Sequence, residues 1–313
     1  MSASPAERAG RLNRRALLRG AAGLGAIVLS GRPAGTGWLA NAAAAPAKAT
    51  IVAAENFYGD VVGQIAGDHV SITSIISDPN ADPHEYESST RDMAAIGRAR
   101  LVIINGLGYD GFMPKLLKAT PNPQREVMDV AHLVGKKEGD NWHIWYDPTV
   151  ILKFARAVTD FFVRVDPANA RSYQNRLLLF EASYKPLTEK VASLRVRFPG
   201  TAVGATEPIF GNMADALDWK VLTPMEFQKS VEEGEDPPAR AIAEMQDQIR
   251  KHAIKVLIYN VQTVSPVTER IRKDANRLGV PVVGVSETLP PRLSYQRWML
   301  KQLDEIEQAV AKK

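Results

Sequence analysis

Residues 166–198 read DPANARSYQNRLLLFEASYKPLTEKVASLRVRF, a long helical pattern near the middle of the chain. Its apolar residues recur at alternating steps of four and three, which places them on one face of a helix. These residues are Tyr173, Leu177, Phe180, Tyr184, Leu187, Val191 and Leu194. Asp166 is a typical N-cap and Pro167 suits the first helical turn, so we expect one long helix that could bend at Pro186.

A coiled-coil dimer would use the same steps. However, the segment has only about three heptads and lacks the matched flanking charges that specify coiled-coil pairing. At ~1.5 Å per residue, some thirty residues form a rod of roughly 45 Å, longer than one lobe of ordinary size is wide. We therefore expect the helix of 166–198 to serve as a shared backbone for two lobes.

Short β-branched runs alternate with helical patterns on both sides of this segment. They are mostly apolar throughout, which is typical of parallel strands covered by helices on both faces. The runs are 49–57, 70–77, 99–106 and 126–131 before the helix, and 201–207, 219–224, 255–260 and 281–287 after it. We predict an α/β protein with two lobes, residues 46–165 and 199–313, each a mostly parallel sheet flanked by helices.

Residues 1–45 have the composition of an export signal. Arg14 and Arg15 precede an uncharged run at 20–31, and the small-residue tract ANAAAA follows at 40–45. Twelve residues at ~1.5 Å each span roughly 18 Å, less than the ~30 Å hydrocarbon core, which makes a membrane anchor the weaker interpretation. The paired arginines are typical of a twin-arginine signal. We expect residues 1–45 to be cleaved.

Charge and cysteine usage narrow the function further. Six of the 39 basic residues but only one of the 35 acidic residues lie within 1–45, so the remaining chain is nearly neutral. The net charge of this part of the chain therefore gives no indication of nucleic-acid binding. The sequence has no cysteine, which excludes disulfides and thiolate metal ligands. It also lacks the residue that bacterial lipoproteins acylate, and we expect a periplasmic protein that is not lipid-anchored.

Four potential metal-binding side chains follow predicted strands. His84 lies in ISDPNADPHEYESST (76–90) and His143 lies in GDNWHIWYDPT (139–149). Glu207 ends the run TAVGATE, and Glu287 ends the run PVVGVSE. Ligands of open parallel sheets bind outside the carboxyl ends of the strands. Two imidazoles from the first lobe and two carboxylates from the second could therefore converge between the lobes.

Each of these residues also has a simpler explanation. His84 could be a loop histidine bonded to a backbone carbonyl, and His143 could be packed in an aromatic rim. Glu207 could cap the helix that Pro208 begins, since an anion is favoured at a helix N-terminus. Glu287 could be a solvated turn residue. Taken together, however, two imidazoles and two carboxylates suit a divalent cation.

Four stretches resemble the zinc/manganese receptor family of bacterial ABC importers, the TroA-like extracytoplasmic solute-binding proteins. They are DPHEYE (82–87), HIWYDP (143–148), the long helix after VDPANARSYQNRL and TEPIFGNMADAL (206–217). The resemblance covers essentially all of the mature chain and implies two lobes bridged by one helix, with one divalent metal in the cleft. By position it assigns His84, His143, Glu207 and Glu287 as the four ligands.

Three departures from the family pattern stand out. The second ligand is preceded by NW, where the family has DP, and Glu287 stands where relatives usually have Asp. The histidine-rich loop of many zinc-dedicated relatives is absent between 107 and 142. Two glutamates lean towards manganese, whereas the usual affinity order places zinc above manganese, so the sequence leaves the metal open.

The resemblance implies a receptor that captures Zn²⁺ or Mn²⁺ as cargo, without a catalytic cofactor, and delivers it to an ABC permease with its ATPase. We expect a monomer and no enzymatic activity. One alternative is a bilobal receptor for an organic ligand such as a siderophore. Another is a secreted metal-dependent hydrolase, although neither HExxH nor a serine-nucleophile elbow is present. A surface adhesin or a metallochaperone also remains compatible with the sequence.

Overall fold

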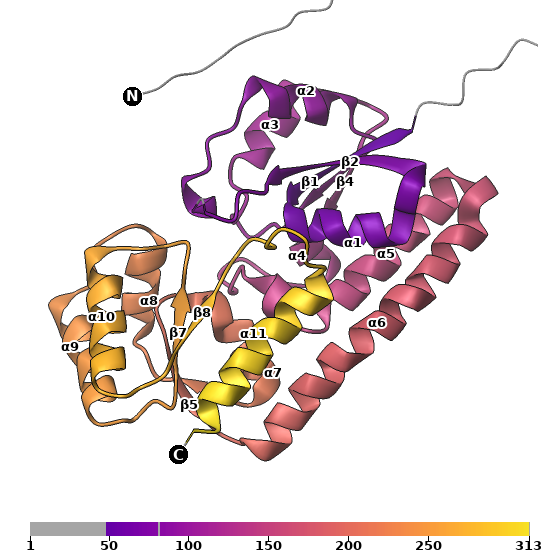
Figure 1. Cartoon of the computed structure of the whole chain (residues 1–313). Helices are drawn as coiled ribbons and strands as arrows, with labels where there is room; N and C mark the ends of the chain where they lie inside the picture. Colours follow the sequence, from indigo (N-terminus) through magenta and orange to yellow (C-terminus); the bar gives the residue numbers. More distant parts are fainter. Residues whose placement is uncertain (1–47, 81, 313) are drawn as a thin grey trace, which may run out of the picture. The chain divides into compact units, whose positions relative to one another are not determined.

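Two four-stranded parallel sheets organise the chain, for which a computed structural model describes residues 48–80 and 82–312 (Figure 1). The first sheet has the order β2-β1-β3-β4 and comprises β1 (Ala49–Glu55), β2 (Val70–Ile76), β3 (Leu101–Ile104) and β4 (Glu126–Asp129). The second has the order β6-β5-β7-β8 and comprises β5 (Ala202–Ala205), β6 (Lys220–Val221), β7 (Leu257–Asn260) and β8 (Val282–Val285). The predicted α/β class with two parallel-sheet lobes is confirmed.

Helices cover both faces of each sheet, which explains why the inner strands β1, β3, β5 and β7 are mostly apolar. The N-terminal lobe contains α1 (Asn56–Ala66), α2 (Thr90–Arg98), α3 (Met113–Ala119), α4 (Val130–Leu133) and α5 (Val150–Val165). The C-terminal lobe contains α7 (Gly211–Leu217), α8 (Met225–Glu232), α9 (Ala239–Arg250), α10 (Pro266–Arg277) and α11 (Tyr295–Val310). A separate small core lies under α2 and α3, and another lies under α9 and α10.

The long helix α6 (Ala170–Arg197) runs beside both lobes (Figure 1) and includes Pro186 without interruption. Six of the seven residues predicted on its inner face are buried, and the seventh, Leu177, is partly buried. Its start differs from the prediction, because a 3₁₀ turn, Pro167–Asn169, precedes the α-helix. Asp166 caps no backbone N–H, since its carboxylate accepts hydrogen bonds from Tyr173 Oη at 2.6 Å and Asn169 Nδ2 at 2.8 Å.

One hydrophobic core is shared by the two lobes. It extends from Ile103 of the first sheet through Tyr184 and Leu187 of α6 to Ile258 of the second sheet. Because protein interiors are close-packed, a shared core resists large independent motion of the lobes. The predicted domain boundaries at 165 and 199 stay a prediction.

Two predictions concern the N-terminal region and membranes. The predicted export signal over 1–45 lies outside the described residues. Within the described part of the chain, no helix has both the length and the apolar character needed to cross a bilayer.

Candidate metal centre

Two 3₁₀ turns that lie beyond strands of the first sheet position the two histidines. His84 lies in a 3₁₀ turn, Pro83–Glu85, whose first residue is buried and whose cap Asp82 accepts the His84 backbone N–H at 2.9 Å. Proline fixes φ in this turn, so His84 loses little chain entropy when it binds a ligand. His143 precedes another 3₁₀ turn, Ile144–Tyr146, and its backbone N–H donates to Asn141 Oδ1 at 3.0 Å.

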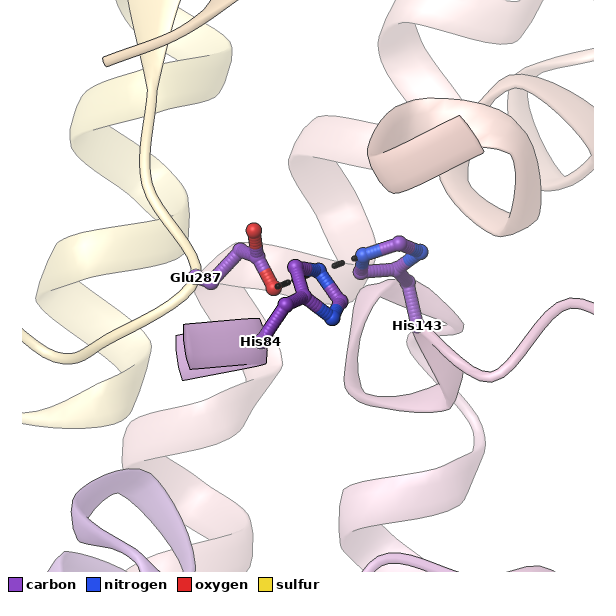
Figure 2. A group of neighbouring side chains, drawn as sticks. All are labelled: His84, His143 and Glu287. Atoms are coloured by element: carbon purple, nitrogen blue, oxygen red, sulfur yellow. Dashed lines mark ion pairs between the residues drawn. The ribbon is translucent and has the colours of Figure 1, made fainter. Parts of the chain in front are cut away.

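The side chains of His84, His143 and Glu287 converge between the lobes (Figure 2). Oε2 of Glu287 lies 3.3 Å from His84 Nε2 and 3.5 Å from His143 Nε2. One ligand atom from each residue lies within 4.8 Å of the others. His143 and Glu287 are fully buried, whereas the His84 side chain is 15% exposed. Neither Nε2 atom has a hydrogen-bond partner among the described residues, so each can bind a cation when it carries no proton.

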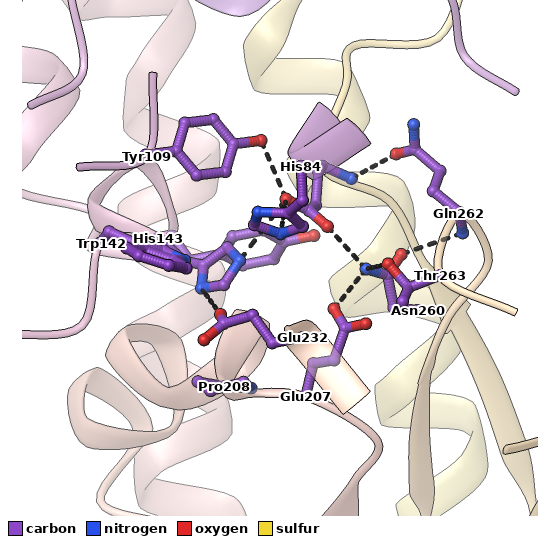
Figure 3. Close-up of polar contacts among 12 residues, drawn as sticks. His84, Tyr109, Trp142, His143, Glu207, Pro208, Glu232, Asn260, Gln262 and Thr263 are labelled. Atoms are coloured by element: carbon purple, nitrogen blue, oxygen red, sulfur yellow. Dashed lines mark hydrogen bonds and ion pairs between the residues drawn. The ribbon is translucent and has the colours of Figure 1, made fainter. Parts of the chain in front are cut away.

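Glu207, the fourth predicted residue, lies beside this group but is not part of it. Its Oε2 accepts a hydrogen bond from Asn260 Nδ2 at 2.5 Å (Figure 3). The same Nδ2 donates to Glu287 Oε1 at 2.7 Å. Oε1 of Glu207 is buried and has no partner. The side chain of Glu207 does not cap the turn that follows it, which removes the simpler explanation of this residue.

Burial and mutual contact set the charges of the centre. Burial by itself would raise the pKa of Glu287, but the close contacts with His143 and His84 lower it well below the usual range. Burial would lower the pKa of His84, but Glu287 raises it to about 9. Burial and the negative charge of Glu287 raise the pKa of Glu207 to about 8. At neutral pH the metal-free centre is therefore a protonated His84 paired with an ionised Glu287, beside a protonated Glu207.

Three further residues complete the surroundings of the centre. Tyr109 donates its hydroxyl to Glu287 Oε2 at 2.8 Å, and Asn260 joins the two carboxylates (Figure 3). Both residues follow or end strands of the sheets, so the rule that selected the four candidates could also have found them. Glu232, which ends α8 and lies 3.7 Å from His143 Nδ1, has no such signal in the sequence.

A cavity of about 470 Å³ opens beside His84 and is rich in carboxylates. Its lining includes Asp82, Glu85, Glu232 and Glu233. Among the described residues that line it there is no arginine, the side chain that a receptor for an organic anion would use. The electrostatics of this opening favour a cation.

Parallel-sheet lobes joined by one long helix, with two imidazoles and buried carboxylates between them, define a bilobal solute-binding protein with a candidate metal centre. The sequence profile of the ZnuA family, described as zinc-uptake complex component A, periplasmic, matches residues 51–309. The chain belongs to this family, and the membership predicted from the sequence is confirmed.

Individual relatives agree with this membership. A putative metal-binding protein of Treponema pallidum is 24% identical over 291 residues, covering 85% of this chain and 88% of the relative. The metal ABC transporter substrate-binding lipoprotein ScbA of Streptococcus cristatus is 23% identical over 292 residues, covering 85% of this chain and 90% of ScbA. The structure of the periplasmic zinc binding protein TroA from Treponema pallidum has a TM-score of 0.72 at 19% identity, covering 85% of this chain and 100% of TroA.

These relatives correct the predicted localisation. We expected a protein without a lipid anchor, because the sequence contains no cysteine. Curated relatives, ScbA among them, are named as lipoproteins, and that part of the prediction is wrong. The expectation of an extracytoplasmic protein stands.

Proposed function

We propose that the chain is an extracytoplasmic receptor that captures a divalent transition metal ion, zinc or manganese, and delivers it to an ABC permease. One observation carries the proposal. His84, His143 and Glu287 come from separate loops and both lobes, yet their ligand atoms meet in a largely buried group. Buried ionisable groups that do not stabilise a core are typical of functional sites.

The four candidate residues would share the work of binding. Nε2 of His84, Nε2 of His143 and Oε2 of Glu287 would contact the ion directly. Glu207 would supply the fourth ligand through Oε1, which has no partner in the metal-free centre. Two neutral imidazoles and two carboxylates neutralise a dication and provide borderline to hard donors.

The proposed ion is zinc or manganese. Four donor atoms would satisfy zinc, whereas bidentate carboxylates could raise the number towards the five or six that manganese accepts. The names of the family and of its relatives include both ions.

The partners and the route follow from the same proposal. Relatives are named as substrate-binding proteins of metal ABC transporters, so we expect a membrane permease with its ATPase as the partner. We expect the receptor to act as a monomer without enzymatic activity. Residues 1–45 would be a cleaved export signal of the twin-arginine type, with Arg14 and Arg15 as its signature.

Metal content and competitive titration test this function directly. Protein purified without chelator should contain close to one equivalent of metal by elemental analysis. The metal-free protein, titrated with Zn²⁺, Mn²⁺ and Fe²⁺ in the same preparation, should bind one ion per chain. A preparation that binds none of these ions would sink the proposal.

A further inference from the structure

Glu232 is a carboxylate of the C-terminal lobe that reaches a histidine of the N-terminal lobe. It ends α8, is 7% exposed, and places Oε1 3.7 Å from His143 Nδ1 (Figure 3). It lies outside the group formed by His84, His143 and Glu287. It also stands outside the four residues assigned above as ligands.

The tautomer of His143 fixes the direction of this contact. Nδ1 lies 3.0 Å from Asn141 Oδ1, whose own amide nitrogen donates to the Pro208 carbonyl at 2.7 Å. Oδ1 can only accept, so Nδ1 carries the hydrogen and Nε2 presents its lone pair to the ion. Glu232 therefore faces the N–H side of the ring, opposite the atom that would bind metal.

Oε1 of Glu232 is a buried acceptor without a hydrogen-bond partner among the described residues, and it lies near buried donors. Nε1 of Trp142 has no partner among these residues either. Burial raises the pKa of Glu232, and the neighbouring Trp142 indole works against this rise. Oε1 of Glu232 thus lies 3.7 Å from His143 Nδ1 of the N-terminal lobe, with the unpartnered Trp142 indole of the same lobe nearby.

We propose that Glu232 is a positioning residue that slows release of the ion by accepting hydrogen bonds from His143 Nδ1 and Trp142 Nε1 when the ion is bound. A cation on Nε2 withdraws electrons from the ring and makes Nδ1–H a stronger donor. A charged carboxylate then becomes a better acceptor than the neutral Asn141 amide. The bond joins the lobes, so it has to break before they separate around the ion.

The cavities beside the site agree with this role. Trp142 and Glu232 line both the cavity of about 470 Å³ next to His84 and a second cavity of about 350 Å³ next to Pro208. Both residues border both cavities, so a contact between them would narrow the space beside His84. Glu233 lines both cavities too, but it is exposed and has no contact with His143, which makes it a matched control.

This inference rests on the proposed metal binding, and its test separates the two. Wild type, Glu232→Gln, Glu233→Gln and Trp142→Phe are loaded with Zn²⁺, and release into excess chromophoric chelator is followed by stopped flow. We expect Glu232→Gln to release zinc about tenfold faster or more, the effect typical of losing an outer-shell partner. Trp142→Phe should be intermediate, and Glu233→Gln should stay within about twofold of wild type.

A spectroscopic readout distinguishes positioning from a merely structural role. The ring Nδ1–H resonance of His143 in the zinc-loaded protein should move upfield in Glu232→Gln, while the melting temperature of the metal-free protein is not lowered. Wild-type release rates and an unmoved resonance in Glu232→Gln would overturn the inference and leave the proposed function intact. A wild type that binds no metal would overturn both.

Discussion

Nε2 of His84 lies 3.3 Å from Oε2 of Glu287, and the two residues belong to different lobes (Figure 2). The same oxygen lies 3.5 Å from His143 Nε2 and accepts the Tyr109 hydroxyl. In the metal-free protein the proton on the His84 imidazole therefore lies where a metal cation would bind. Protons and metal compete for one set of atoms, so binding, pH and stability are coupled.

Removing His84 tests its assignment as a ligand. His84→Ala should abolish the rise in melting temperature that saturating Zn²⁺ or Mn²⁺ produces in the wild type, because that rise reports binding to the folded state. His132→Ala is the matched control, since His132 is exposed and lies outside the centre, and its metal-induced rise should be kept. An unchanged rise in His84→Ala would remove this residue from the site.

Metal binding should release protons at neutral pH. Because Glu287 raises the pKa of His84 to about 9, this imidazole is protonated at pH 7 and has to lose about one proton to ligate. Affinity should therefore rise with pH up to about 9, well beyond the range of an ordinary histidine. Isothermal titration calorimetry in buffers of different ionisation enthalpy measures the number released.

The number of protons also tests Glu207. Its pKa of about 8 means that it too is protonated at pH 7. If it ligates, wild type should release about two protons, and Glu207→Gln should release about one fewer. Equal proton release by the two proteins would show that Glu207 does not ligate.

The metal-free protein should lose stability as the pH rises from 7 to 10. The folded-state pKa of His84 is raised above its ordinary value, so its contribution is present in full below about pH 6.5 and is lost as the pH passes about 9. The raised pKa of Glu207 also makes the folded protein less stable as the pH rises, and this loss is complete above about pH 8. The lowered pKa of Glu287 changes nothing in this window, since its contribution is lost only in acid. Thermal melts at each pH measure the slope.

Glu207→Gln separates the two groups that cause this slope. Glutamine resembles the protonated acid, so the variant avoids the free energy of ionising a buried carboxyl. At pH 9 it should be more stable than wild type by about 1–3 kcal/mol without metal, and its pH dependence should be flatter. A variant that melts with the wild-type slope would contradict the raised pKa.

The spacing of apolar residues predicted the fold well, because each helix or strand has its own pattern of apolar residues. The predicted strands 70–77 and 255–260 contain β2 and β7. β7 is buried along its whole length, as expected for a parallel strand covered on both faces, whereas β2 lies at the edge of its sheet and exposes Ser71. The inner face of α6 was predicted from steps of three and four. Its start was not, because the Tyr173 hydroxyl competes for Asp166, and this contact depends on tertiary packing.

The site was harder to predict than the fold. Residues that follow strands share one edge of a sheet, and this rule brought His84, His143 and Glu287 to one place. This rule did not predict that the Asn260 amide binds Glu207 and that Glu207 lies beside His84, His143 and Glu287 rather than among them. Glu232 ends a helix rather than a strand, and only the packing of one lobe on the other brings it to His143.

Asn260 should matter more to the metal-free protein than to the loaded one. Its Nδ2 donates to both Glu207 and Glu287, and without it two buried carboxyl groups lose their shared donor. Asn260→Ala should destabilise the metal-free protein by about 1–3 kcal/mol. A bound cation stabilises both carboxyl groups in place of the lost amide donor, so the metal-induced rise in melting temperature should be larger than in wild type. A smaller rise would indicate that Asn260 supports the bound state instead.

Two leucines of α6 test whether the shared core joins the lobes. Leu187 is fully buried in the core common to both, whereas Leu178 is 64% exposed on the same helix. Leu187→Ala should lower the free energy of unfolding by about 2–5 kcal/mol, through lost burial and the cavity left behind. Leu178→Ala should change it by less than about 0.5 kcal/mol. Denaturant unfolding, followed by probes specific to each lobe, should show one transition in both variants because the core is continuous. Two separate transitions in the wild type would mean that α6 connects the lobes without coupling their unfolding.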